Sequence, residues 1–159
     1  IEKLPFKSNS FDLVYSMFVI EHAENAEKVI KEGIRVLRPG GAFIIGTPNY
    51  GSPNRRSPNS KENKFSKLIK DFLPRSKNGL DWTRVEPSKG KYFIDADTKV
   101  ERYIGSLIIY LKKLGLIVQK ASSLWEIDDF SLLQFPFRVF GLLKIPPFVW
   151  WGPQIFIIA

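Results

Sequence analysis

Four stretches near the start of the chain decide its fold. Residues 11–15 read FDLVY, residues 26–37 read AEKVIKEGIRVL, residues 39–41 read PGG and residues 42–47 read AFIIGT. The first and last are apolar runs typical of buried strands, the first ending near Ser16. The second has apolar residues at helical spacing, which predicts a helix with Asn25 as its N-cap. Strand, helix, tight turn and strand make a βαβ unit, which predicts an α/β fold with a parallel sheet.

The remaining sequence gives signals for further elements. Residues 51–63 are rich in Ser, Pro, Asn and Arg, which predicts a loop, and an apolar stripe over residues 65–72 predicts a short basic helix. Thr98 and Glu101 form a capping-box pattern that predicts the start of a helix closed by Gly115. Residues 116–121 and 155–158 are predicted strands that form an antiparallel pair. Residues 130–151 are rich in aromatic side chains and contain proline, which predicts irregular structure.

Composition narrows the function classes. The 159 residues carry a net charge of +8, are 44% hydrophobic and contain no cysteine, which excludes disulfides, thiolate metal sites and a cysteine nucleophile. No apolar run reaches the roughly 18 residues needed to span a bilayer. The basic residues concentrate between Pro53 and Asn78, which suggests an anionic partner, either nucleic acid or a lipid surface. The lack of cysteine fits a reducing cytoplasm, the expected location.

The order of several short motifs resembles a known family. They are Leu4-Pro5-Phe6, Ser10-Phe11-Asp12-Leu13-Val14, Glu21-His22, Arg35-Val36-Leu37-Arg38-Pro39-Gly40-Gly41, Thr47-Pro48-Asn49 and Lys112-Lys113-Leu114-Gly115-Leu116. Together they resemble the later part of class I S-adenosylmethionine-dependent methyltransferases, in the subgroup that includes ubiquinone-biosynthesis-type and other small-molecule enzymes. The resemblance covers residues 1–50 well and residues 95–121 and 152–159 loosely.

The resemblance implies a fold and a cofactor. The fold is a Rossmann-like, mostly parallel seven-stranded sheet, of which this chain would supply strands 4 to 7 with helical and aromatic insertions. We expect a single incomplete methyltransferase domain, with a βαβ core over 1–50, a basic insertion over 51–97, and a helix with terminal antiparallel strands over 98–159. The family's glycine-rich turn and ribose-binding acid are absent from these residues, so the chain by itself is expected to be inactive.

The resemblance also implies where S-adenosylmethionine binds. Leu4, Pro5 and Phe6 correspond to the turn where the family forms its apolar adenine pocket. Ser16, Met17 and Phe18 follow the fourth strand, where backbone carbonyls and the Ser16 hydroxyl are candidates to bind the methionyl ammonium. A plain turn and an ordinary strand-to-helix loop are the alternative interpretations of these two segments.

The acceptor side is predicted from the neighbouring residues. His22, the sole histidine, is a candidate general base, although structural support or pocket lining is the favoured role for His22 and Glu21. Pro48, Asn49 and Tyr50 end the fifth strand beside the expected substrate, and Asn49 either binds the substrate or serves the turn.

Two other classes of function remain open. A non-catalytic basic module that binds a membrane surface or RNA explains the charge between Pro53 and Asn78, but not the run of motifs. An α/β enzyme with another nucleotide cofactor is a third possibility. The basic helix and the stretch 135–140, together with Phe148, Trp150 and Trp151, also favour peripheral contact with an anionic membrane, nucleic acid being the less favoured partner. The alternative is that the aromatic side chains pack into the domain and the lysines form a solvated face.

Overall fold

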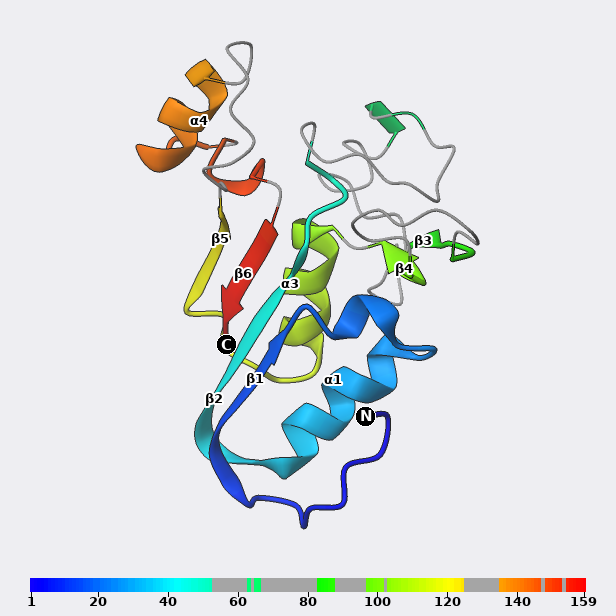
Figure 1. Ribbon diagram of the computed structural model, residues 1–159. Coiled ribbons are helices and arrows are strands. Elements are labelled where there is room, and N and C mark those ends of the chain that lie inside the picture. Colours follow the sequence, from blue (N-terminus) through cyan, green and yellow to red (C-terminus); the bar gives the residue numbers. More distant parts are fainter. Residues whose placement is uncertain are drawn as a thin grey trace.

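The computed structural model in Figure 1 describes residues 1–52, 63, 65–66, 83–87, 97–101, 103–124, 135–146, 148–152 and 154–159. The predicted basic segment between Pro53 and Asn78 and its helix therefore lie outside the described residues, apart from Asn63, Phe65 and Ser66. Phe65 and Ser66 are helical, and the Ser66 amide donates a hydrogen bond to Asn63 Oδ1 at 2.7 Å.

One mixed sheet organises the described residues. Its four strands lie in the order β1 (Phe11–Met17), β2 (Leu37–Pro48), β6 (Gln154–Ile158) and β5 (Lys120–Leu124). Strands β1 and β2 are parallel, whereas β6 is antiparallel to both β2 and β5. The predicted βαβ unit and the predicted antiparallel pair at the chain end are therefore both present. A separate two-stranded sheet pairs β3 (Thr83–Arg84) with β4 (Val100–Glu101).

Helix α1 (Ala26–Val36) crosses from β1 to β2 with the predicted cap. The Asn25 side chain accepts a hydrogen bond from the Lys28 amide at 3.0 Å. The predicted turn at Pro39-Gly40-Gly41 is placed differently, because β2 already begins at Leu37. The turn forms an irregularity inside β2, where the pairing shifts between Phe11 and Leu13 of β1 and Gly40 adopts φ +79°.

Helix α3 (Ile104–Lys113) begins later than the capping-box pattern predicts. Val100 and Glu101 are buried in β4, and Tyr103 is the N-cap without a side-chain hydrogen bond. Strand pairing and burial outweigh a local cap here. The helix ends as predicted at Gly115, which has φ +89° while the Leu116 amide binds the Leu111 carbonyl in a Schellman motif. The motif engages Leu116, and the pairing of β5 with β6 begins at Lys120 opposite Ile158, so β5 starts at Lys120 rather than at 116.

The region predicted to be irregular contains helical structure. Helix α4 (Phe135–Leu142) and the 3₁₀ turn η2 (Phe148–Trp150) lie within residues 130–151. In Figure 1, α4 stands at the top of the sheet, beyond the ends of β5 and β6. Proline at the second position of α4 is tolerated because the first helical turn needs no amide donor.

The core lies on one face of the sheet. Phe43 and Ile45 of β2 and Ile155 and Ile157 of β6 are buried and pack against apolar residues of α1 and α3. On the opposite face of β1, Leu13 and Tyr15 are 51% and 72% exposed. The prediction of a fully buried first strand was therefore wrong for the described residues, because helices cover only one of its two faces.

Among the described residues, none of the helices is long and apolar enough to cross a membrane.

The contact between α1 and β2 depends on a glycine. A Cβ added at Gly33 would lie 2.7 Å from Cζ of the buried Phe43 ring, well inside van der Waals contact. Gly33→Ala would gain about 1 kcal/mol of helix propensity but would overpack the core at a cost of about 1–3 kcal/mol. We expect a net loss of about 1 kcal/mol of unfolding free energy, measured by chemical denaturation.

Lys31→Ala is the matched control, because Lys31 is exposed on the same helix. Its unfolding free energy should change by less than about 0.5 kcal/mol. A Gly33→Ala variant more stable than Lys31→Ala would contradict this account of the interface between α1 and β2.

Candidate active site

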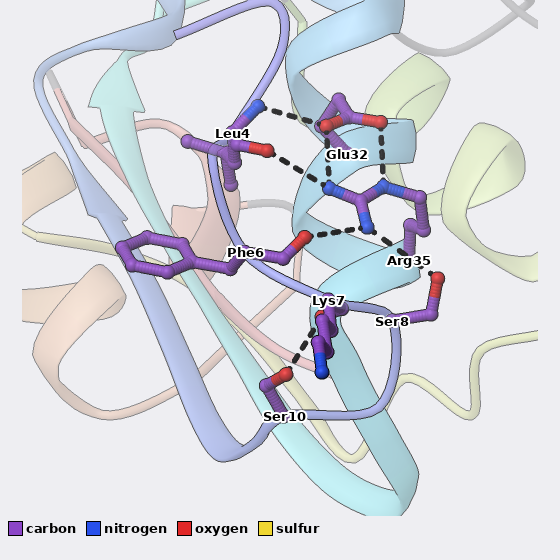
Figure 2. A network of polar contacts seen from close by, with 7 residues as sticks. All are labelled: Leu4, Phe6, Lys7, Ser8, Ser10, Glu32 and Arg35. Carbon is purple, nitrogen blue, oxygen red and sulfur yellow. Dashed lines mark hydrogen bonds and ion pairs between the residues drawn. The ribbon is translucent and has the colours of Figure 1, made fainter.

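The predicted cofactor-side segment Leu4–Phe6 is held against α1 by Glu32 and Arg35 (Figure 2). Glu32 Oε2 accepts a hydrogen bond from the Leu4 amide at 2.9 Å. Arg35 donates to the carbonyl oxygens of Leu4 and Phe6 at 3.2 and 2.9 Å. Three backbone groups of this segment are thus engaged with α1. Its side chains are available to a ligand, since Leu4 is half-buried and Pro5 and Phe6 are exposed.

Glu32 and Arg35 also bind each other through two parallel hydrogen bonds. Arg35 Nε lies 2.8 Å from Glu32 Oε1, and Arg35 Nη2 lies 2.9 Å from Oε2. The hydrogen bonds from Arg35 and from the Leu4 amide lower the pKa of Glu32 from 4.5 to about 2, and the pKa of Arg35 is raised in turn. The pair is therefore ionised at neutral pH and holds the segment Leu4–Phe6 against α1.

The carboxyl end of β1 carries Ser16, Met17 and Phe18. Ser16 Oγ is buried and has no hydrogen-bond partner among the described residues. The Met17 side chain packs against the backbone of Gly46 in β2. A Cβ added at Gly46 would lie only 2.6 Å from the Met17 sulfur. Phe18 is 41% exposed and adopts φ +53°, and its amide binds the Gly46 carbonyl at 2.9 Å. A non-glycine residue at positive φ costs free energy and is frequent at functional sites.

Glu21 and His22 lie on the short turn η1 (Ile20–His22) that follows β1. Glu21 is buried, and its Oε2 accepts a hydrogen bond from Thr47 Oγ1 at 3.1 Å. His22 is about one-third exposed, with Nδ1 3.2 Å from Asp97 Oδ2 and Nε2 3.9 Å from Glu21 Oε1. Two carboxylates therefore flank the imidazole and restrict its orientation.

The end of β2 carries Pro48, Asn49 and Tyr50, all buried. Pro48 pairs with Gln154 of β6. Asn49 Nδ2 donates to the carbonyl oxygens of Trp150 and Gly152 at 2.8 and 2.9 Å, whereas its Oδ1 is buried without a partner among the described residues. The Tyr50 hydroxyl lies 3.0 Å from Thr98 Oγ1. Asn49 therefore ties β2 to η2, and its Oδ1 is the atom it can still offer a ligand.

Asp97 and Thr98 were not predicted as site residues from the sequence, and Thr47 was noted only as part of the motif Thr47-Pro48-Asn49. Thr47 supplies the donor to Glu21, Asp97 flanks His22, and Thr98 binds Tyr50. Thr47 ends a buried strand, which is a signal that could have drawn attention to it. Asp97 and Thr98 lie 75 and 48 residues from their partners, so no local pattern identifies them.

The cluster is suited to binding and proton handling. It places a buried carboxylate, an imidazole and several hydroxyl groups at the carboxyl ends of two adjacent parallel strands, where α/β folds commonly bind ligands. Within the described ranges, no group of three or more His, Cys, Asp and Glu side chains could hold a metal ion.

Comparisons with known proteins agree with the geometry. Residues 1–45 match a family model described as a methyltransferase domain. The chain is 43% identical over 44 residues to sterol 4-C-methyltransferase strm-1 of Caenorhabditis elegans, covering 28% of this chain and 13% of that protein. It is 27% identical over 128 residues to sterol 24-C-methyltransferase erg6 of Schizosaccharomyces pombe, covering 78% of this chain and 33% of that protein.

A solved structure is similar over almost the whole chain. It is an S-adenosylmethionine-dependent methyltransferase from Mesorhizobium loti, with a TM-score of 0.53 and 17% identity, covering 99% of this chain and 65% of that one. At this identity the likeness concerns the fold, which is mixed α/β and Rossmann-like. The chain spans about a third or less of the length of the curated relatives it matches.

These matches confirm the resemblance to class I S-adenosylmethionine-dependent methyltransferases. They also identify S-adenosylmethionine as the cofactor of this family, as the resemblance implies.

The Glu32–Arg35 pair predicts a specific pH dependence of stability. Because the pKa of Glu32 is lowered in the folded state, its contribution is present above about pH 4.5 and is lost as the pH falls towards 2. The unfolding free energy of the wild type should exceed that of Glu32→Gln at pH 6. The difference should shrink between pH 4.5 and about 2, as followed by urea denaturation at each pH.

Glu27→Gln is the control, because Glu27 lies on the same helix and, among the described residues, accepts no hydrogen bond from residues 1–10. A difference between wild type and Glu32→Gln that stays constant from pH 6 to pH 2 would contradict an ionised Glu32 as the group that holds this segment.

Proposed function

We propose that the intact protein transfers a methyl group from S-adenosylmethionine to a small-molecule or lipid-like acceptor, an activity of class EC 2.1.1. One observation carries the proposal: the buried Glu21–Thr47 pair joins the carboxyl ends of β1 and β2, within a sheet and motif order similar to those of the methyltransferases. In open α/β sheets this is the edge where ligands bind.

The strand order supports a correspondence with the family sheet. If β1 and β2 are strands 4 and 5, then β6 and β5 are strands 7 and 6, with the antiparallel strand 7 between 5 and 6. The exposed Leu13 and Tyr15 on β1 also support this proposal, since further elements would cover them in a seven-stranded domain. We extend the proposal to a single methyltransferase domain with insertions after residue 50 and before the last strand.

The cofactor is assigned to the two segments that flank β1. Leu4, Pro5 and Phe6 offer apolar side chains, which suit one side of an adenine pocket. Ser16 offers a buried hydroxyl that lacks a partner among the described residues, and an oxygen acceptor suits the methionyl ammonium. Met17 and Phe18 complete this segment. When bound, the cofactor supplies an electrophilic methyl group on its sulfonium.

The acceptor is assigned to the end of β2 and to η1. Asn49 Oδ1 is a buried acceptor for a substrate donor, with Pro48 and Tyr50 beside it in the chain. Glu21, buried and held by Thr47, orients this edge. His22 can accept a proton from an acceptor hydroxyl, although alignment of donor and acceptor supplies much of the rate in such transfers.

A lipid-like acceptor is favoured by two relatives. Both strm-1 of C. elegans and erg6 of S. pombe are named as sterol methyltransferases. The non-catalytic basic module remains a second hypothesis, but the segment that motivates it lies largely outside the described residues. A cytoplasmic location stays a prediction.

Calorimetry tests the proposal directly. Titration of the full-length protein with S-adenosylmethionine should give saturable binding, and titration with NAD should give none. Binding of NAD instead would replace the proposal with another nucleotide-dependent enzyme. Transfer of labelled methyl groups to a sterol or quinol panel would then identify the acceptor class.

Substitution of His22 distinguishes a positioning role of this residue from general base catalysis. Because Asp97 Oδ2 lies 3.2 Å from Nδ1 and orients the imidazole, we expect His22→Gln to lower kcat by less than about tenfold and to leave the shape of the pH–rate profile unchanged. A loss of about 10²–10⁴ together with a changed profile would instead assign His22 as the general base. Asp97→Asn serves as the companion variant, since it perturbs the orientation of His22 without removing the ring.

A further inference from the structure

The surface formed by α4 and the turn that follows it is unusually apolar. Within residues 135–145, five large apolar side chains are 40–67% exposed: Phe135, Phe140, Leu142, Leu143 and Ile145. We call these five residues the α4 patch. Scattered exposed apolar residues are normal on a protein surface, whereas a concentration of them is a feature of binding surfaces.

The charged side chains of the chain segment that contains the α4 patch are all of one sign. Residues 130–159 contain no Asp or Glu, and Arg138 and Lys144 are their two charged side chains. Lys144 is exposed at the C-terminus of α4, between Leu143 and Ile145. An apolar surface with basic residues and without acids complements the interface of an anionic bilayer, where apolar groups enter the acyl boundary and Lys and Arg reach the headgroups.

The turn after α4 has a defined conformation. The Ile145 amide binds the Phe140 carbonyl at 3.0 Å, the Lys144 amide binds the Gly141 carbonyl at 3.0 Å, and Lys144 itself adopts φ +59°. This is a Schellman motif with lysine at the position where glycine is usual. It holds Leu143, Lys144 and Ile145 in a fixed turn at the end of the helix.

The α4 patch is anchored to the rest of the fold from behind. The Phe148 ring packs on Phe140 of α4 at 5.2 Å and on Trp151 at 5.1 Å between centroids. Ser123 of β5 accepts a hydrogen bond from the Gly152 amide and donates one to the Val149 carbonyl, both at 2.6 Å. The patch is thus attached to a supported segment of backbone.

The same segment is attached to the end of β2. Asn49 donates to the Trp150 and Gly152 carbonyls, and Ser52 Oγ donates to the Trp151 carbonyl at 2.5 Å. A bilayer bound to the α4 patch would therefore be linked through η2 to the residues proposed to face the acceptor.

We propose that the α4 patch inserts into the interface of an anionic membrane, with Lys144 and Arg138 contacting lipid phosphates. This inference concerns a binding surface and stands independently of methyl transfer. Its occupant is a lipid bilayer rather than another protein or nucleic acid, because exposed aromatic and aliphatic groups are combined here with the basic side chains of Arg138 and Lys144, and residues 130–159 contain no acidic side chain.

Co-sedimentation of the full-length protein with vesicles tests the proposal. One set of vesicles is phosphatidylcholine alone, and in the other roughly a third of the lipid is phosphatidylglycerol. We expect stronger binding to the anionic vesicles. Leu142→Asp with Leu143→Asp should reduce the partition coefficient about tenfold or more, because apolar insertion is lost and negative charge is added.

The control carries the same change of charge at another exposed apolar site. Ile109→Asp with Ile117→Asp alters residues that are 44% and 80% exposed outside α4, and should reduce binding by less than about threefold. Thermal unfolding of both double variants verifies that they are folded.

Three results would overturn the proposal. They are failure of the wild type to bind anionic vesicles at low salt, equal binding by the two double variants, and self-association in the absence of vesicles that Leu142→Asp with Leu143→Asp abolishes. The last result would identify the α4 patch as an interface between copies of the chain.

Discussion

Strand β2 is hydrogen-bonded on both of its edges, and the arrangement of the described residues depends on this. Residues 42–46 of β2 pair in parallel with Leu13–Met17 of β1. Residues 44–48 of β2 pair in antiparallel fashion with Gln154–Ile158 of β6. A strand paired on both sides has its backbone donors and acceptors satisfied, so it can be buried. Its side chains Phe43 and Ile45 then contact α1 and α3, and the close approach of Gly33 to Phe43 sets how near α1 can come.

The position of β2 also explains where the polar groups gather. Parallel β1 and β2 end at the same edge, so Glu21 and Thr47 come together although 26 residues separate them. On the other side, antiparallel β6 returns the chain to the end of β2, and Asn49 binds the carbonyl oxygens just before that strand. The candidate site and the backbone segment that supports the α4 patch are therefore both attached to the carboxyl end of β2.

Local patterns were sufficient where the interaction itself is local. The Asn25 cap, the helix that follows it and the Gly115 terminus depend on groups a few residues apart, and each was confirmed. The capping-box prediction at Thr98 was wrong because its two polar residues are used elsewhere: Thr98 binds Tyr50, and Glu101 is buried in β4. A side chain that fits a local capping motif can instead form its hydrogen bond with a residue far away in the sequence.

The sequence by itself determined the βαβ unit, the antiparallel end of the sheet and the resemblance to class I methyltransferases, since these depend on periodicity and on motif order. Only the tertiary structure decided that Thr47 binds Glu21, that Asp97 flanks His22 and that the Asn49 amide ties β2 to η2. It also decided that one face of β1 is exposed and that α4 presents an apolar surface. The physical reason is that burial and hydrogen-bond pairing are properties of groups brought together from 26 to 103 residues apart, which no local pattern encodes.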